Sequence, residues 1–150
     1  MRQDAGDMAT IQRSPWVGAE GTCGAQPILI RARQVLDRLV GSATAPFLLV
    51  ITYFYESSDD TGLPSKEQYE QIASFEACAI DAMEAQGVGV VMLIRTSNGS
   101  VKYFCYVSGV DEAAAFFSKC FHETDHVEMA SDNDPGWEEF RRQRGMTTGW

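Results

Sequence analysis

The chain has 150 residues, of which 45% are hydrophobic, and this length and composition are typical of one domain with its own core. Its 12 basic and 21 acidic residues give a formal net charge of -9. A field of this sign repels phosphate backbones and anionic membranes and attracts basic partners. The composition therefore argues against a nucleic-acid-binding protein and against a membrane-surface protein.

The N-terminal residues are polar and lack the apolar stretch of a signal peptide. We expect residues 1–14 to form a flexible segment and residues 15–150 to form a single α+β domain. The longest apolar run is too short to cross a bilayer. The four cysteines include no C-x-x-C pair, and three lie in apolar runs, so a reduced, cytoplasmic protein is the simpler expectation.

The first third of the chain predicts two strands. Glycines and prolines mark turns over residues 14–27, where Trp16 is expected to act as an anchor. Residues 28–32 alternate like a strand, and the apolar spacing of residues 35–40 predicts that this strand passes into a short helix. Residues 47–56 are β-branched and aromatic on both faces, which is typical of a central strand.

A long helix follows a polar turn. Ser65 and Gln68 have the S-x-x-Q spacing of a capping box, and Gly87 is expected to end the helix after about Gln86. Glu76 interrupts the apolar stripe of this helix. The stripe consists of Tyr69, Ile72, Phe75, Ala79, Ile80 and Met83.

The second half of the chain predicts a hairpin and two shorter helices. Residues 88–96 and 100–108 read as strands joined by an Asn-Gly turn. Ser108 and Asp111 repeat the capping-box spacing before an amphipathic helix that reaches residue 121. A short strand follows at residues 126–130.

Asp134 is expected to cap a final short helix, with Pro135 at its first position and Trp137 and Phe140 as anchors. The whole pattern predicts an α+β fold. We expect a mainly antiparallel sheet with two principal helices packed on one face, as a two-layer sandwich of ferredoxin-like character.

Residues His122–His126, "HETDH", match the zinc-protease pattern H-E-x-x-H. That chemistry requires both histidines on one face of a helix, with Glu123 between them as general base. Thr124 and Asp125 favour a loop instead, and the chain has no third histidine to serve as a ligand. We therefore predict no metal site, and a zinc-dependent hydrolase using this stretch stays an alternative.

Other motifs indicate no enzyme and no cofactor. The aromatic strand at residues 101–107 resembles an RNA-stacking platform only loosely, because the glycine positions of that pattern are missing and the net charge opposes it. Tyr103 and Tyr106 are also expected to point to opposite faces, so only one of them could line a platform. The acidic stretches Glu56–Asp60 and Asp132–Asp134 lack the spacing of a calcium-binding loop. We find no nucleophile elbow, Walker loop or Rossmann glycine set.

The order of several features resembles an uncharacterised bacterial domain family. These features are Gly62–Pro64 before the long helix, Glu76 inside it, the hairpin with its aromatic second strand, Asp134–Pro135 followed by Trp137, and Trp16 near the start. Such domains also occur joined to regulator-of-ribonuclease-E-B-like domains, and relatives occur beside bacterial toxins as candidate immunity proteins. The resemblance implies a small α+β regulator and supplies no catalytic residues.

The combined hypothesis is an acidic binding protein that neutralises a bacterial toxin or nuclease by direct contact. The predicted partner-binding residues are Asp59, Asp60, Trp137, Glu138 and Glu139. For Trp137 the alternative is a core residue under the last helix. A regulator of an endogenous ribonuclease is the alternative function.

Overall fold

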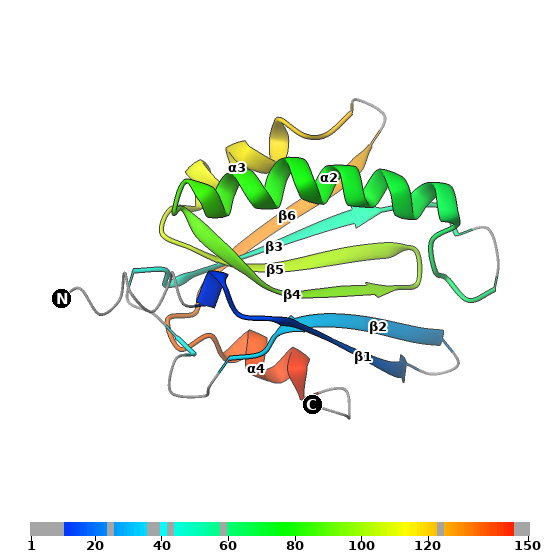
Figure 1. Ribbon diagram of the computed structural model, residues 1–150, viewed down its shortest axis with the longest axis horizontal. Coiled ribbons are helices and arrows are strands. Elements are labelled where there is room, and N and C mark those ends of the chain that lie inside the picture. The colour runs from blue at the N-terminus through cyan, green and yellow to red at the C-terminus, as the bar shows by residue number, and fades with distance from the viewer. Residues whose placement is uncertain are drawn as a thin grey trace.

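The computed structural model describes residues 11–23, 26–35, 40–41, 44–57, 60–122 and 125–145 (Figure 1). Within these residues, one six-stranded sheet is covered by helices, which confirms the predicted α+β class. The strands are β1 (Trp16–Cys23), β2 (Gln26–Arg33), β3 (Phe47–Phe54), β4 (Gly89–Ser97), β5 (Ser100–Val107) and β6 (His126–Asn133). The helices are α2 (Lys66–Ala85), α3 (Val110–Ser118) and α4 (Glu138–Arg144).

The sheet has the strand order β1-β2-β4-β5-β3-β6, and all neighbouring strands are antiparallel. The run β3-α2-β4-β5-α3-β6 is a β-α-β-β-α-β unit whose first and third strands lie in the middle of its part of the sheet. This arrangement is the ferredoxin-like one that the sequence predicted. The β1–β2 hairpin extends the sheet beyond β4.

Helices α2 and α3 pack side by side on one face of the sheet (Figure 1). Phe75 of α2 lies at the centre of this layer, with its ring centroid 5.7 Å from that of Tyr103, 5.8 Å from that of Phe117 and 5.1 Å from that of Phe121. The apolar stripe of α2 therefore forms the main core, as expected. Tyr69 is the exception, because 43% of it is exposed.

The opposite face of the sheet carries a second core under α4. Trp137 is completely buried there, and its ring stacks on that of Tyr106 at 4.6 Å. The indole Nε1 of Trp137 donates a hydrogen bond to the carbonyl oxygen of Ala45 at 3.0 Å. Phe140 belongs to the same cluster. Tyr103 and Tyr106 thus point to opposite faces, as predicted, and both are buried.

The predicted cap of the long helix and the predicted hairpin turn are confirmed. Ser65 Oγ accepts from the Gln68 backbone N–H at 3.2 Å, and Gln68 Oε1 accepts from the Ser65 N–H at 2.7 Å. Asn98 and Gly99 have φ angles of 46° and 82°, the left-handed values that a two-residue hairpin turn requires.

Three local predictions are corrected. Residues 16–23 form a strand and not turns, because they pair with β2 along its whole length, and such pairing overrides weak local propensity. Ser108 does not cap α3; its hydroxyl donates to the Val88 carbonyl, and Gly109 is the N-cap residue. Ile11 was placed in the flexible segment, but it is fully buried in the second core. The predicted short helix at residues 35–40 falls largely outside the described residues.

The cysteine prediction is also corrected. Cys78 of α2 and Cys120, just after α3, form a disulfide with a Cα–Cα distance of 6.0 Å. They are 42 residues apart and meet only because α2 packs on α3, so their spacing in the sequence gave no signal. Cys105 is a free, buried thiol whose pKa is raised by burial.

Among the described helices, none has the length and apolar composition that a membrane crossing needs.

Candidate functional site

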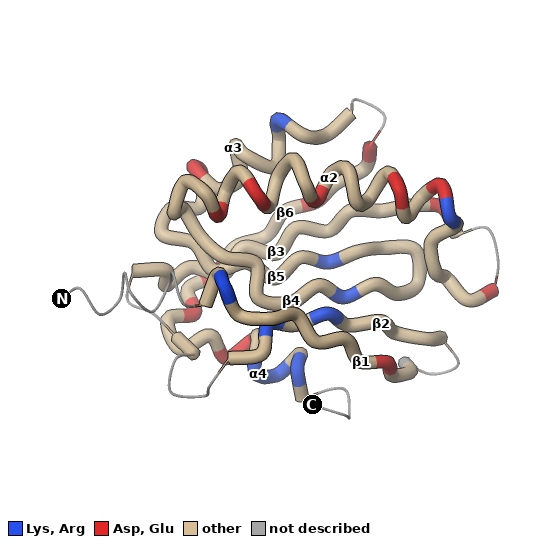
Figure 2. Tube along the Cα trace, viewed as in Figure 1, with Lys and Arg blue, Asp and Glu red and all other residues tan. Residues whose placement is uncertain are grey.

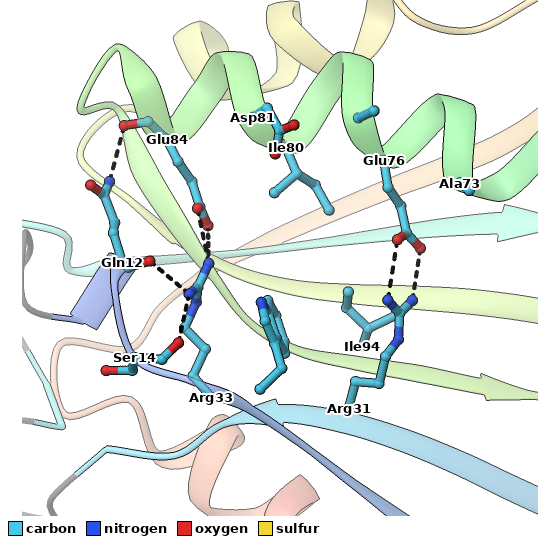
Figure 3. Close-up of a pocket in the computed structure, with 12 residues that line it drawn as sticks. Gln12, Ser14, Arg31, Arg33, Ala73, Glu76, Ile80, Asp81, Glu84 and Ile94 are labelled. Carbon is cyan, nitrogen blue, oxygen red and sulfur yellow. Dashed lines mark hydrogen bonds and ion pairs between the residues drawn. The ribbon is translucent and has the colours of Figure 1, made fainter.

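A groove of about 470 Å³ lies between α2 and the β1–β2 hairpin (Figure 3). The residues of β2 that line this groove are Arg31 and Arg33, and α2 contributes Glu76 and Glu84 together with Asp81 and apolar side chains. Two Arg–Glu ion pairs therefore cross from the sheet to the helix. The environments of the two pairs differ in their exposure to solvent.

Arg33 is almost completely buried, with 4% of its side chain exposed, and it joins three parts of the fold. Its Nη2 donates to both carboxylate oxygens of Glu84, at 2.9 Å and 2.8 Å. Its other donors reach the carbonyl oxygens of Val91 in β4 and of Gln12 and Ser14 near the N-terminus. Burial raises the pKa of Glu84, although hydrogen bonds from the Val91 N–H and from Arg33 oppose the rise.

The second pair lies nearer to solvent. Arg31 donates to both carboxylate oxygens of Glu76, at 3.3 Å and 2.9 Å, and the Tyr103 hydroxyl donates to Glu76 Oε2 at 2.8 Å. Burial and the neighbouring Glu76 carboxylate hold the pKa of Tyr103 well above its usual value. Trp16 is 40% exposed, and the guanidinium carbon of Arg33 lies 4.5 Å from its ring centroid.

In both pairs the arginine neutralises the charge of the glutamate and donates hydrogen bonds to it. A bidentate Arg–carboxylate pair with two parallel N–H···O bonds is a strong and geometrically specific contact, and the Arg31–Glu76 pair has this form. Arg33 reaches both oxygens of Glu84 from Nη2 alone. The buried Arg33 and its partner Glu84 hold α2, β2, β4 and the N-terminal segment together. We therefore assign the groove a structural role, and Glu76, which interrupts the apolar stripe, is explained by its bonds to the sheet.

The "HETDH" stretch does not form one helical turn in the described residues. Helix α3 ends at Ser118, His122 follows it, and His126 is the first residue of β6. The His126 ring stacks on Phe54 at 4.5 Å and lies 3.3 Å from a Glu128 oxygen. Glu123 and Thr124 fall outside the described residues. Where the structure describes the chain, no three His, Cys, Asp or Glu side chains come together as a candidate metal site.

The predicted partner-binding residues do not form a single patch. Asp59 lies outside the described residues, and Asp60 is exposed in the loop before α2. Glu138 and Glu139 begin α4, on the sheet face opposite α2 and α3. Trp137 is fully buried, so its core alternative is the one that the structure shows.

Glu139 is engaged within α4. Its carboxylate pairs with Arg142 and accepts a hydrogen bond from Gln143 at 2.7 Å. The hydrogen bond from Arg142 is the main reason that the pKa of Glu139 is lowered. Arg141 and Arg144 follow in the same short helix, so α4 is not an acidic surface.

The structure reveals a surface that the sequence analysis missed. The outer face of α2 is acidic along its length in Figure 2, and the first turn of α3 adds Asp111 and Glu112. We call this surface the acidic helix face; its exposed carboxylates belong to Glu67, Glu70, Asp81, Asp111 and Glu112. Exposed Tyr69 lies on α2 within it. The sequence indicated this surface through the acidic residues that lie between the apolar stripe positions of α2.

Basic residues gather on the opposite side of the sheet. Figure 2 shows them on β4, β5 and α4. They are Arg95, Lys102, Arg141, Arg142 and Arg144. Exposed acidic side chains thus predominate on the helix side and basic ones on the opposite face, although Arg31 and Arg33 pair with α2 and Glu138 and Glu139 belong to α4.

Fold and surface together define a small ferredoxin-like α+β domain with an added β-hairpin, an acidic helix face and a basic opposite face. The chain belongs to a family of unknown function (DUF695), whose model matches residues 14–142. The predicted resemblance to an uncharacterised domain family is confirmed to this extent. Searches of curated proteins and of solved structures found no match to this chain.

Proposed function

We propose that this protein is a small binding protein that neutralises a bacterial toxin or nuclease by direct contact, in the manner of an immunity protein. The observation that carries the proposal is the acidic helix face with its exposed tyrosine. Nucleases bind phosphate groups through clusters of lysine and arginine, so their active surfaces are basic. An acidic surface complements such a site and accelerates the encounter.

Tyr69 supplies the second element that a specific interface requires. Binding energy in interfaces is concentrated in a few aromatic or arginine anchors, surrounded by contacts that contribute little. Tyr69 is 43% exposed on α2, between the acidic residues Glu67 and Glu70. We place the centre of the interface here, and not at Trp137, whose side chain is buried.

The same acidic face would also serve a regulator of an endogenous ribonuclease, because both partners present basic surfaces. The family resemblance supports both functions, through relatives beside toxins and through relatives joined to regulator-of-ribonuclease-E-B-like domains. The identity of the captured partner separates the two.

The test is a capture experiment with matched variants. Tagged protein is incubated with native cell extract at low salt and at about 0.15 M salt, where exposed charges are largely screened. The first variant, Glu67→Lys with Glu70→Lys, reverses two charges on the acidic helix face. The control, Glu138→Lys with Asp132→Lys, reverses two exposed charges outside it.

We expect one basic partner that is retained at the higher salt, is lost with the α2 variant and is kept with the control. The purified partner should then lose its catalytic activity when the wild-type protein is added in equimolar amount. A partner that stays fully active in the complex, or that binds the α2 variant as tightly as wild type, would contradict the proposal.

A further inference from the structure

A second cavity, of about 560 Å³, lies on the face of the sheet opposite α2 and α3. It is bounded by β3, β4 and β5, by the β4–β5 hairpin turn and by α4. This volume is within the range of small-molecule sites. The cavity is separate from the ion-paired groove and from the acidic helix face, because the sheet lies between them.

The floor of this cavity is apolar and partly aromatic. Val50 and Phe104 are directly opposite each other on β3 and β5, and both line the cavity. Phe54, four residues further along β3 on the same face, adds a second ring at the β6 side, where it stacks on His126. A planar apolar group of a ligand can therefore lie against side chains from two strands.

The wall of the cavity is cationic. Arg95 and Lys102 are direct cross-strand neighbours on β4 and β5, and like charges in this position repel each other. Arg142 of α4 adds a third cation, and Glu139, which pairs with Arg142, is the one carboxylate among the described lining residues. A pocket with three cations and one carboxylate is unexpected in a protein with a net charge of -9.

Lys102 is the group that points most directly to a ligand. It is half-buried, and no carboxylate or other hydrogen-bonding group pairs with its ammonium in the part of the chain that the structure describes. The residues opposite Lys102 on the neighbouring strands do not neutralise its positive charge. They are Thr52 on β3, which is uncharged, and Arg95 on β4, which is also positive. Such a cation is stabilised when an anion enters the pocket.

We propose that this cavity binds a small organic anion, with its phosphate or carboxylate group held by Lys102 and Arg95 and its planar body against Phe54 and Phe104. Arginine and lysine are the side chains that proteins use for both anionic groups. A long nucleic acid strand fits the face less well, because α4 covers its continuation over Tyr106 and the net charge opposes binding.

The test is calorimetric titration of the full chain with defined probes. Adenosine 5′-monophosphate and benzoate carry a planar body with a phosphate or a carboxylate; inorganic phosphate and adenosine each carry one half of the first probe. Lys102→Gln removes the proposed contact, and Lys66→Gln, on the other side of the molecule, makes the same change in net charge. Near-ultraviolet circular dichroism checks that each variant is folded.

We expect adenosine monophosphate or benzoate to bind with a Kd below about 1 mM, and to bind more tightly than inorganic phosphate or adenosine. Lys102→Gln should weaken this binding about tenfold or more, which is the loss expected for a charge-assisted contact. Lys66→Gln should leave the Kd within about twofold of wild type. Arg95→Gln should reproduce the loss, as an independent variant.

Three results would overturn the proposal. The first is that no probe gives saturable binding up to about 10 mM, the weak limit of specific recognition. The second is equal weakening by Lys66→Gln and Lys102→Gln, which would mean only general attraction by charge. The third is tighter binding of a single-stranded oligonucleotide than of its mononucleotide, which would make the face a polymer-binding surface.

Discussion

Replacing Glu84 with alanine is the sharpest test of the ion-paired groove. The variant removes two charge-assisted hydrogen bonds to Arg33, and it removes the acceptor of the Val91 N–H, which lies 2.9 Å from Glu84 Oε2. Arg33 remains in place because its other donors bind three carbonyl oxygens, so its charge stays buried without a counter-ion.

The magnitude follows from the burial of the two partners. Breaking a buried ion pair by deleting one partner costs about 3–5 kcal/mol. Glu84 is 15% exposed, so water can reach the vacated space, and this favours the lower end of the range. Alanine also restores a few tenths of a kcal/mol of helix propensity. We therefore expect Glu84→Ala to lower the free energy of unfolding by about 3 kcal/mol, which corresponds to roughly 6–12 °C in Tm.

The assay is urea unfolding followed by tryptophan fluorescence and far-ultraviolet circular dichroism. Glu70→Ala is the matched control, because it makes the same change at an exposed position of the same helix and should cost less than about 0.5 kcal/mol. A cycle with Arg33→Met isolates the coupling between the partners. A loss below about 1 kcal/mol for Glu84→Ala, or one equal to that of Glu70→Ala, would refute the structural role of the pair.

Three further predictions concern the core, the disulfide and the cap of α4. Trp137→Ala should destabilise the fold by about 3–5 kcal/mol, because it empties a fully buried site; a change below about 1 kcal/mol in urea unfolding would show that the indole is not a core residue. Reducing the Cys78–Cys120 disulfide should lower stability by up to about 4 kcal/mol, because it frees a loop of 42 residues in the unfolded chain, and equal melting curves with and without reductant would contradict the link. The pKa of Asp134 is lowered because hydrogen bonds from the Tyr106 hydroxyl and two backbone N–H groups outweigh the opposing effect of burial. Its contribution to stability is therefore present above its ordinary pKa of 3.8 and is lost as the pH falls through the lower folded value. Asp134→Asn should thus be less stable than wild type at pH 7 and should lose less stability below about pH 4, as thermal melts across this range would measure.

Local signals predicted much of the fold. The Ser65–Gln68 capping box, the Asn98–Gly99 turn and the apolar stripe of α2 each depend on residues close in the sequence, and each is confirmed. Asp134 lies before the first residue of α4, Glu138, but its carboxylate still caps the helix. It accepts hydrogen bonds from the backbone N–H groups of Glu138 and Glu139. Pro135 precedes the helix and is not its first residue.

The remaining features depend on partners far away in the sequence. The glycine-rich β1 has weak strand propensity and exists because β2 pairs with it. The Arg33–Glu84 pair spans 51 residues, and the disulfide spans 42, so neither leaves a local pattern. Trp137 illustrates the same difficulty for sites: a tryptophan is typical of both a core and an interface, and only the packing on Tyr106 distinguishes them.

The position of β3 in the sheet also bears on how the protein can form during synthesis. The two neighbours of β3 are β5 and β6, and both follow it in the chain. A chain growing on the ribosome therefore exposes the apolar segment Phe47–Phe54 until Ser100–Val107 has emerged, and its second edge stays open until His126–Asn133 follows. An apolar strand with unpaired edges is prone to associate with other chains. Truncated forms that end before β5 should accordingly aggregate, and the ferredoxin-like part of the sheet cannot be completed until β6 has emerged.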